Sequence, residues 1–263
     1  MTHVAASRPA FFGGLDMGSH SVKAVVLDAD LRLAGLAIVP SGISYNLSAQ
    51  QALEQACGQA GDEPDGLERL VSTGYGRHGL SRGSQARTEI LCHAKGAYHF
   101  FPEAITVVDI GGQDSKVIRL DAGGNRLGYK LNRKCAAGTG SFLETVANRL
   151  NLDPAEMNNL ARKAAKASPI NSFCSVFAAS EVTERIRAGE PVKEIILGVF
   201  HSLVQRVLEM ERIRGAVVLT GGVVEHNPVV ADVLAALSGA QVMVPPHPQH
   251  VGALGAALIA AEK

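Results

Sequence analysis

Three glycine-bearing turns contain the residue types that bind phosphate. Residues 16–21, 109–116 and 220–222 accompany apolar stretches, and the first two segments begin with an aspartate. Glycine lets backbone amides approach a ligand closely, clustered amides hold phosphate oxygens, and a nearby carboxylate holds Mg²⁺. One Gly-Gly turn after a strand is more often only a turn. All three in this order predict a nucleotide site, with candidate contacts Asp16, Gly18, Ser19, His20, Ser21, Lys23, Asp109, Gly111, Gly112, Gln113, Gly221 and Gly222.

Two common nucleotide motifs are absent from the sequence. It contains no Gly-x-x-x-x-Gly-Lys-Ser/Thr, and no Gly-x-Gly-x-x-Gly follows the first predicted strand. The first absence excludes a P-loop protein, and the second leaves a dinucleotide-binding fold without its fingerprint.

The four cysteines are Cys57, Cys92, Cys135 and Cys174, and none lies in a Cys-x-x-Cys. Cys135 and Cys174 come just before predicted helices, where free amides and the helix dipole favour thiolate over thiol. By spacing alone, an isolated cysteine is more often a small buried apolar residue than a ligand. That is our interpretation of Cys57 and Cys92. For the other two, the residues alone leave ligation open.

Alternating strand and helix patterns predict an α/β fold that positions these residues. We expect strands within 11–27, 31–39, 70–73, 105–110, 116–120, 216–219 and 242–244. We expect helices over 48–60 with Ser48 as N-cap, 89–98, 141–150, 155–167, 176–188, 192–213, 227–237 and 251–261. Two strand–glycine turn–strand units, each with an aspartate, suggest two related lobes.

Composition narrows the function classes. Among 263 residues, Lys plus Arg and Asp plus Glu both number 25, and no basic run is visible. The sequence therefore offers no basic surface to neutralise nucleic-acid phosphates, and we expect no nucleic-acid partner. Neither a signal peptide nor an apolar membrane span is apparent, so we expect a cytoplasmic protein with no membrane partner.

The order Asp-x-Gly-Ser, Asp-Ile-Gly-Gly-Gln-Asp-Ser-Lys and Thr-Gly-Gly resembles the phosphate-1, phosphate-2 and adenosine motifs of the actin, sugar kinase and heat-shock chaperone superfamily. Residues 109–116 and 132–144 look like the ATP-dependent activators of 2-hydroxyacyl-CoA dehydratases. The wider family of these activators includes ATP-binding subunits of benzoyl-CoA reductase. The resemblance covers residues 14–260, with one departure: His20 stands where a small hydroxyl residue is expected.

This resemblance implies two actin-like (ribonuclease H-like) lobes with ATP in the cleft between them. We expect residues 13–104 plus 252–263 to form the first lobe and 105–251 the second. Asp16 and Asp109 would lie near Mg²⁺, Gly221 and Gly222 near adenosine, and Asp109 and Gln113 would be catalytic.

The resemblance also implies that Cys135 and Cys174 bind iron. A [4Fe–4S] cluster takes four thiolates, so two per chain require a homodimer that shares one cluster. The implied activity is an ATPase that drives one electron from ferredoxin or flavodoxin to a CoA-ester dehydratase or reductase. The alternatives are a small-molecule kinase like N-acetylglucosamine kinase, the ATP-binding subunit of an aromatic-ring CoA reductase, and a chaperone-like ATP-dependent scaffold.

Overall fold

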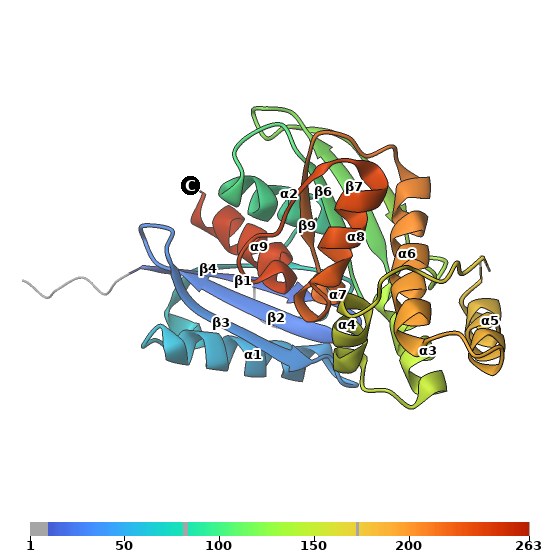
Figure 1. The fold of residues 1–263 in the computed structure, drawn as a ribbon. Helices are drawn as coiled ribbons and strands as arrows, with labels where there is room; N and C mark the ends of the chain where they lie inside the picture. The colour runs from blue at the N-terminus through green and yellow to red at the C-terminus, as the bar shows by residue number, and fades with distance from the viewer. Residues whose placement is uncertain (1–9, 81–83, 172–173, 263) are drawn as a thin grey trace, which may run out of the picture. The chain divides into compact units, whose positions relative to one another are not determined.

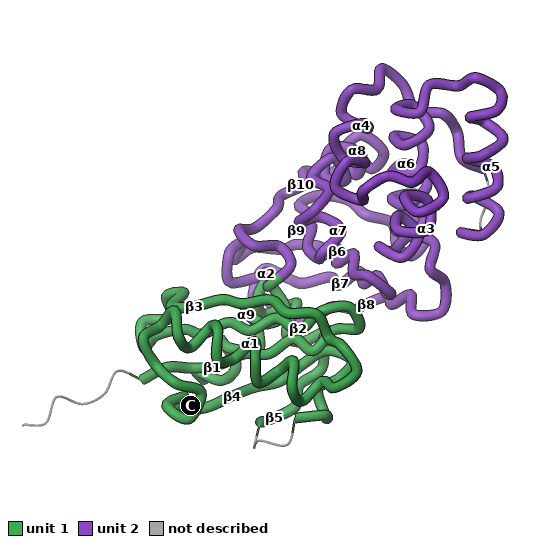
Figure 2. The backbone as a smooth tube through the Cα atoms, turned by 90° about the horizontal axis from the view of Figure 1, so that it is seen from below, with its two compact units in different colours: residues 1–96, 250–263 green, residues 97–249 purple. Residues whose placement is uncertain are grey.

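The computed structural model describes residues 10–80, 84–171 and 174–262. The chain divides into two compact units (Figure 2). Unit 1 comprises Met1–Gly96 and His250–Lys263, and unit 2 comprises Ala97–Gln249. Each unit contains one five-stranded mixed sheet, so the expected α/β architecture with two sheets is confirmed.

The sheet of unit 1 has the strand order β3-β2-β1-β4-β5, in which β1–β3 are antiparallel and β4 and β5 run parallel to β1. Helix α1 covers one face and α9 the other (Figure 1). The elements are β1 (Phe11–Met17), β2 (Ser21–Leu27), β3 (Leu33–Pro40), α1 (Tyr45–Gln59), η1 (Pro64–Gly66), β4 (Leu67–Thr73), β5 (Gln85–Ala86), α2 (Glu89–Phe100), η2 (Pro248–His250) and α9 (Val251–Ala261).

The sheet of unit 2 has the order β10-β9-β6-β7-β8. Helices α4, α6 and α8 pack against one another, and α6 contributes seven of its nine buried residues to the hydrophobic core. The elements are β6 (Thr106–Ile110), β7 (Ser115–Leu120), β8 (Arg126–Asn132), α3 (Gly140–Leu150), α4 (Pro154–Arg162), α5 (Ser175–Arg187), α6 (Val192–Met210), β9 (Ala216–Thr220), α7 (Gly222–His226), α8 (Val229–Ser238) and β10 (Gln241–Met243).

The two sheets have one topology, because β8-β7-β6-β9-β10 repeats β3-β2-β1-β4-β5 in strand direction and connection. The repeat extends to residue positions. In unit 1, Asp16 is opposite Lys23 on β2 and Thr73 on β4. In unit 2, Asp109 is opposite Lys116 on β7 and Thr220 on β9. The predicted relation between the two halves therefore holds at single-residue register.

Close backbone packing holds α9 against the sheet of unit 1. Nine of its eleven residues are buried. A Cβ on Gly14 of β1 would lie 2.1 Å from the carbonyl oxygen of Ala253, so only glycine permits this approach. The predicted packed C-terminal helix is confirmed.

Several predicted element bounds were wrong. Helix α1 begins at Tyr45 with Ser44 as N-cap, so Ser48 lies inside the helix. Strand β8 was missed because none of its seven residues is buried, so it lacks the apolar alternation of a buried strand. Helices α4 and α6 end before the predicted positions, at Arg162 and Met210. In the part of the chain that the structure describes, no helix is long and apolar enough to span a membrane.

Candidate functional site

The first predicted phosphate turn is the tight connection between β1 and β2. The Gly18 amide donates to the Ser21 carbonyl at 3.1 Å, and the Ser41 hydroxyl donates to the Gly18 carbonyl at 2.6 Å. Ser19 and His20 are exposed at the tip, where Ser19 Oγ lies 3.3 Å from His20 Nδ1. The turn is therefore fixed at its base, and its polar tip is open to solvent.

The second predicted turn connects β6 and β7. The Gly111 amide donates to the Asp114 carbonyl at 2.9 Å, and Gln113 is exposed at the tip. Amides of the following helix secure it from behind: Gly140 donates to the Gly111 carbonyl and Ser141 to the Gly112 carbonyl, both at 2.9 Å.

Asp109, at the end of β6, is the centre of a buried polar cluster. Lys116 Nζ donates to Asp109 Oδ2 and to Asp114 Oδ1, both at 3.0 Å, and Thr220 Oγ1 donates to Asp109 Oδ1 at 3.0 Å. The side chains of Asp109 and Lys116 are each 4% exposed. Such a pair is held by its mutual charge and hydrogen bonds, because an unpaired charge at this depth is costly.

Asp16 occupies the equivalent position in unit 1 but has different surroundings. A Cβ on Gly252 would lie 3.0 Å from Asp16 Oδ2, so this carboxylate approaches the first turn of α9. Thr73 donates to the Arg87 carbonyl at 3.0 Å and also interacts with the Cys92 thiol. The nearest atoms to a Cβ on Gly18 include Lys23 Nζ, at 3.2 Å, so that ammonium lies beside the phosphate turn.

The third predicted turn adjoins the second. Gly221 has φ = 105°, and a Cβ there would lie 2.3 Å from the Ile110 carbonyl oxygen, so glycine is required by both conformation and space. Its amide donates to the Pro248 carbonyl at 3.0 Å. Gly222 begins α7 rather than continuing a turn. Unit 2 thus brings Asp109, Gly111 and Gly221 together, while Asp16 to Lys23 belong to unit 1.

The cysteines divide by exposure. Cys57 and Cys92 are buried, as expected, and burial raises the pKa of the Cys92 thiol to about 12. Cys135 and Cys174 are exposed. Cys174 is the N-cap of α5, whereas Cys135 lies in the loop before α3, whose N-cap is Thr139. Cys135 therefore begins the glycine-bearing segment that leads into α3, and α3 itself starts one residue earlier than the predicted start at Ser141.

Side-chain bonds hold the Cys135 loop in shape. Asn132 Nδ2 donates to the Cys135 carbonyl at 2.9 Å, and the Cys135 amide donates to Asn132 Oδ1 at 3.2 Å. The Ser115 hydroxyl donates to the Gly138 carbonyl, which attaches the loop to the start of β7.

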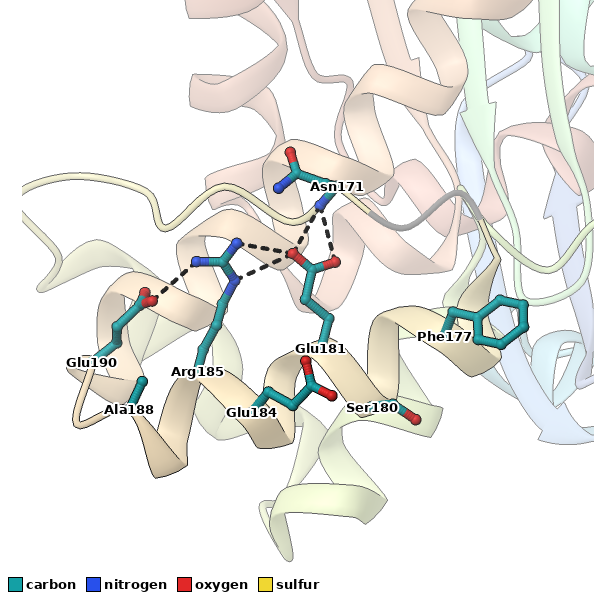
Figure 3. Close-up of a pocket in the computed structure, with 8 residues that line it drawn as sticks. All are labelled: Asn171, Phe177, Ser180, Glu181, Glu184, Arg185, Ala188 and Glu190. Atoms are coloured by element: carbon teal, nitrogen blue, oxygen red, sulfur yellow. Dashed lines mark hydrogen bonds and ion pairs between the residues drawn. The ribbon is translucent and has the colours of Figure 1, made fainter.

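A pocket of about 680 Å³ runs along α5, the helix that begins after Cys174 (Figure 3). Arg185 bridges Glu181 and Glu190 across it, at 2.9 and 3.0 Å, and the Asn171 amide donates to Glu181. The Glu181 carboxylate raises the pKa of Arg185, and a hydrogen bond from Ser168 lowers that of Glu190. None of the phosphate-turn residues lines this pocket, and its network joins Asn171 and Glu190 to residues of α5.

The sequence did not reveal the roles of Lys116 and Thr220 as partners of Asp109. The available signal was the Asp–Lys separation of seven residues, which both hairpins share because a tight turn places the lysine opposite the aspartate. Thr220 lies on a strand distant in sequence, and only the parallel β6–β9 pairing brings it to Asp109.

Comparison with known proteins identifies the family of this chain. Residues 14–260 match the BadF/BadG/BcrA/BcrD ATPase family. The chain belongs to this family. As a member it is an ATPase, which binds ATP, and the predicted recognition is confirmed.

Individual relatives of this ATPase align over nearly its whole length. The activator of lactoyl-CoA dehydratase from Anaerotignum propionicum is 42% identical over 252 residues, covering 95% of this chain and 96% of that protein. The crystal structure of component A of (R)-2-hydroxyglutaryl-CoA dehydratase from Acidaminococcus fermentans has a TM-score of 0.91 and 34% identity, covering 96% and 98%. The activator of 2-hydroxyisocaproyl-CoA dehydratase from Clostridium difficile, solved with ADPNP bound, has a TM-score of 0.87 and 34% identity, covering 95% and 94%.

Proposed function

We propose that this ATPase is an activator of a 2-hydroxyacyl-CoA dehydratase and that ATP hydrolysis drives one electron into that partner. The observation that carries the proposal is the 42% identity, over 95% of the chain, to an activator of lactoyl-CoA dehydratase. The family favours ATP hydrolysis over the alternative of a small-molecule kinase.

In this proposal, nucleotide is held by the three glycine turns. Backbone amides at the turn tips, from Ser19 to Ser21 and at Gly112 and Gln113, bind phosphate oxygens, with Lys23 adding positive charge, and Gly221 and Gly222 approach adenosine. Asp16 suits Mg²⁺ because it is a carboxylate near the first phosphate turn. Asp109 and Gln113 act on the attacking water, Asp109 from a position that Lys116 and Thr220 fix.

Cys135 and Cys174 fit a shared [4Fe–4S] cluster. Both are exposed, and thiolate is the ligand that such a cluster takes. Two cysteines per chain supply half of the four thiolates, so a second copy would complete the ligand set. Val176 and Phe177, 67% and 69% exposed beside Cys174, supply apolar surface for that copy to cover.

The cluster, when bound, supplies a one-electron carrier. A reduced ferredoxin or flavodoxin gives up one electron and the dehydratase gains it. In this chain, the backbone of Cys174 is the N-cap of α5 and the backbone of Cys135 is held by Asn132, so both cysteines stand at defined points of the main chain. The free amides at the start of α5 offset negative charge on Cys174.

The test is iron content after anaerobic purification of the full chain. About two irons per chain, in a dimer, is the expected result, since four thiolates hold one four-iron cluster. Cys135→Ser or Cys174→Ser should lose the iron and the ability to activate dehydratase, and both should still bind ADPNP. Cys57→Ala is the matched control and should keep iron. About four irons in a monomer, or none in any preparation, would contradict the shared cluster.

A further inference from the structure

Lys116 is a buried cation that connects two parts of the second phosphate turn. Its Nζ lies 3.0 Å from Asp109 Oδ2, at the end of β6, and 3.0 Å from Asp114 Oδ1, at the end of the turn. One ammonium group therefore joins the two ends of the loop that carries Gly111 and Gly112.

The burial of Lys116 defines what its charge can reach. Its side chain is 4% exposed, and that of Asp109 is equally buried. An ammonium group has three N–H donors, and two of them point to these carboxylates. This geometry directs the positive charge into the protein rather than toward a bound phosphate.

Lys23, the topological equivalent in unit 1, is placed differently. It pairs in register with Asp16 just as Lys116 pairs with Asp109. Lys23 is only partly buried, however, and its Nζ would lie 3.2 Å from a Cβ on Gly18. The two lysines thus share one register position but differ in place: Lys23 lies beside its phosphate turn, whereas Lys116 is buried between Asp109 and Asp114.

We propose that Lys116 is a positioning residue, which holds the Gly111–Gly112 turn in its phosphate-binding shape by bridging Asp109 and Asp114 and makes no contact with nucleotide. The inference rests on the proposed nucleotide site at this turn. It assigns Lys23 and Lys116, which the sequence pattern makes equivalent, to different tasks.

Asp114 provides the means to test the bridge without disturbing the buried pair. Its side chain is 22% exposed and also lies 3.7 Å from the half-exposed Arg133. Asp114→Ala removes the acceptor and the charge at the end of the turn and leaves the Lys116–Asp109 pair in place. Lys116→Met removes both contacts.

The experiment is a double-mutant cycle on the full chain, with the dissociation constant of Mg-ADPNP measured by titration calorimetry. Each single variant should bind about tenfold more weakly, and the double variant no more weakly than Lys116→Met, since residues that act through one another are not additive. Lys130→Met, an exposed lysine on β8, is the control and should bind normally. Multiplying effects in the double variant, or normal binding by both single variants, would overturn the inference.

Two further readouts separate positioning from other roles. A direct lysine–phosphate contact makes affinity dependent on ionic strength, so the salt dependence of binding should be the same in Lys116→Met and wild type. Should Lys116→Met not fold, Asp114→Ala decides alone: weaker binding at an unchanged melting temperature supports the inference, and normal binding overturns it. Failure of the wild-type chain to bind ADPNP would instead reject the proposed function, and the inference with it.

Discussion

Replacing Thr220 by valine tests how strongly the β9 strand end supports Asp109. The substitution keeps the shape of the side chain and removes the 3.0 Å hydrogen bond from Oγ1 to Asp109 Oδ1. Thr220 is fully buried, and Asp109 is 3% exposed, so water does not replace the lost donor. A hydrogen bond to a charged group contributes about 1.5–3 kcal/mol, against about 0.5–1.5 kcal/mol for a neutral pair.

Thr73→Val is the matched control, because Thr73 has the same register position in unit 1 and is also fully buried. Its hydroxyl donates to the neutral Arg87 carbonyl at 3.0 Å and also interacts with the Cys92 thiol, so neither partner is a carboxylate. We therefore expect Thr220→Val to lower the free energy of unfolding by about 2 kcal/mol, and Thr73→Val by about half as much. For a unit of this size, the larger change corresponds to a fall of about 4–8 °C in Tm.

The assay is urea unfolding of the nucleotide-free protein, followed by circular dichroism, with scanning calorimetry for Tm. An equal or larger loss in Thr73→Val would refute the reasoning, because it would mean that the Asp109 charge does not strengthen the Thr220 hydrogen bond. If Thr220→Val is as stable as wild type, the hydrogen bond from Thr220 to Asp109 contributes nothing to stability.

Four other variants test further features. Asp109→Asn should slow ATP hydrolysis much more than it weakens ADPNP binding, because the charge acts on the attacking water; steady-state turnover equal to wild type would exclude that role. Gly255→Ala should destabilise by about 1–3 kcal/mol, since its Cβ would lie 1.8 Å from the Cys92 carbonyl oxygen. Gly58→Ala in α1 has open space and should stabilise by up to about 1 kcal/mol; equal unfolding midpoints would contradict both expectations. The unfolded chain releases the Cys92 proton above about pH 8.5 while the folded chain retains it to about pH 12, so this thiol should lower stability by about 1.4 kcal/mol per pH unit in between. Cys92→Ala should remove that slope, which parallel unfolding curves at pH 8 and 10 can measure.

Local patterns were sufficient to predict the strand–turn–strand units and most helices. Alternation and glycine mark β1, β2, β6 and β7, and each of these strands has a predicted counterpart. Strand β8 escaped prediction because pairing with β7, rather than its own apolar pattern, makes it a strand.

The sequence by itself determined which residues have the chemistry for phosphate and for iron: two aspartates beside glycine turns, and four thiols. The resemblance already favoured Cys135 and Cys174 as ligands, but only the tertiary structure decided the exposure of each thiol and the partners of Asp109. Burial separates Cys57 and Cys92 from the exposed Cys135 and Cys174, and strand pairing joins Thr220 and Lys116 to Asp109. The physical reason is that exposure and long-range hydrogen bonds depend on which strands become neighbours, and a local pattern of residue types contains no information about strands far away in the chain.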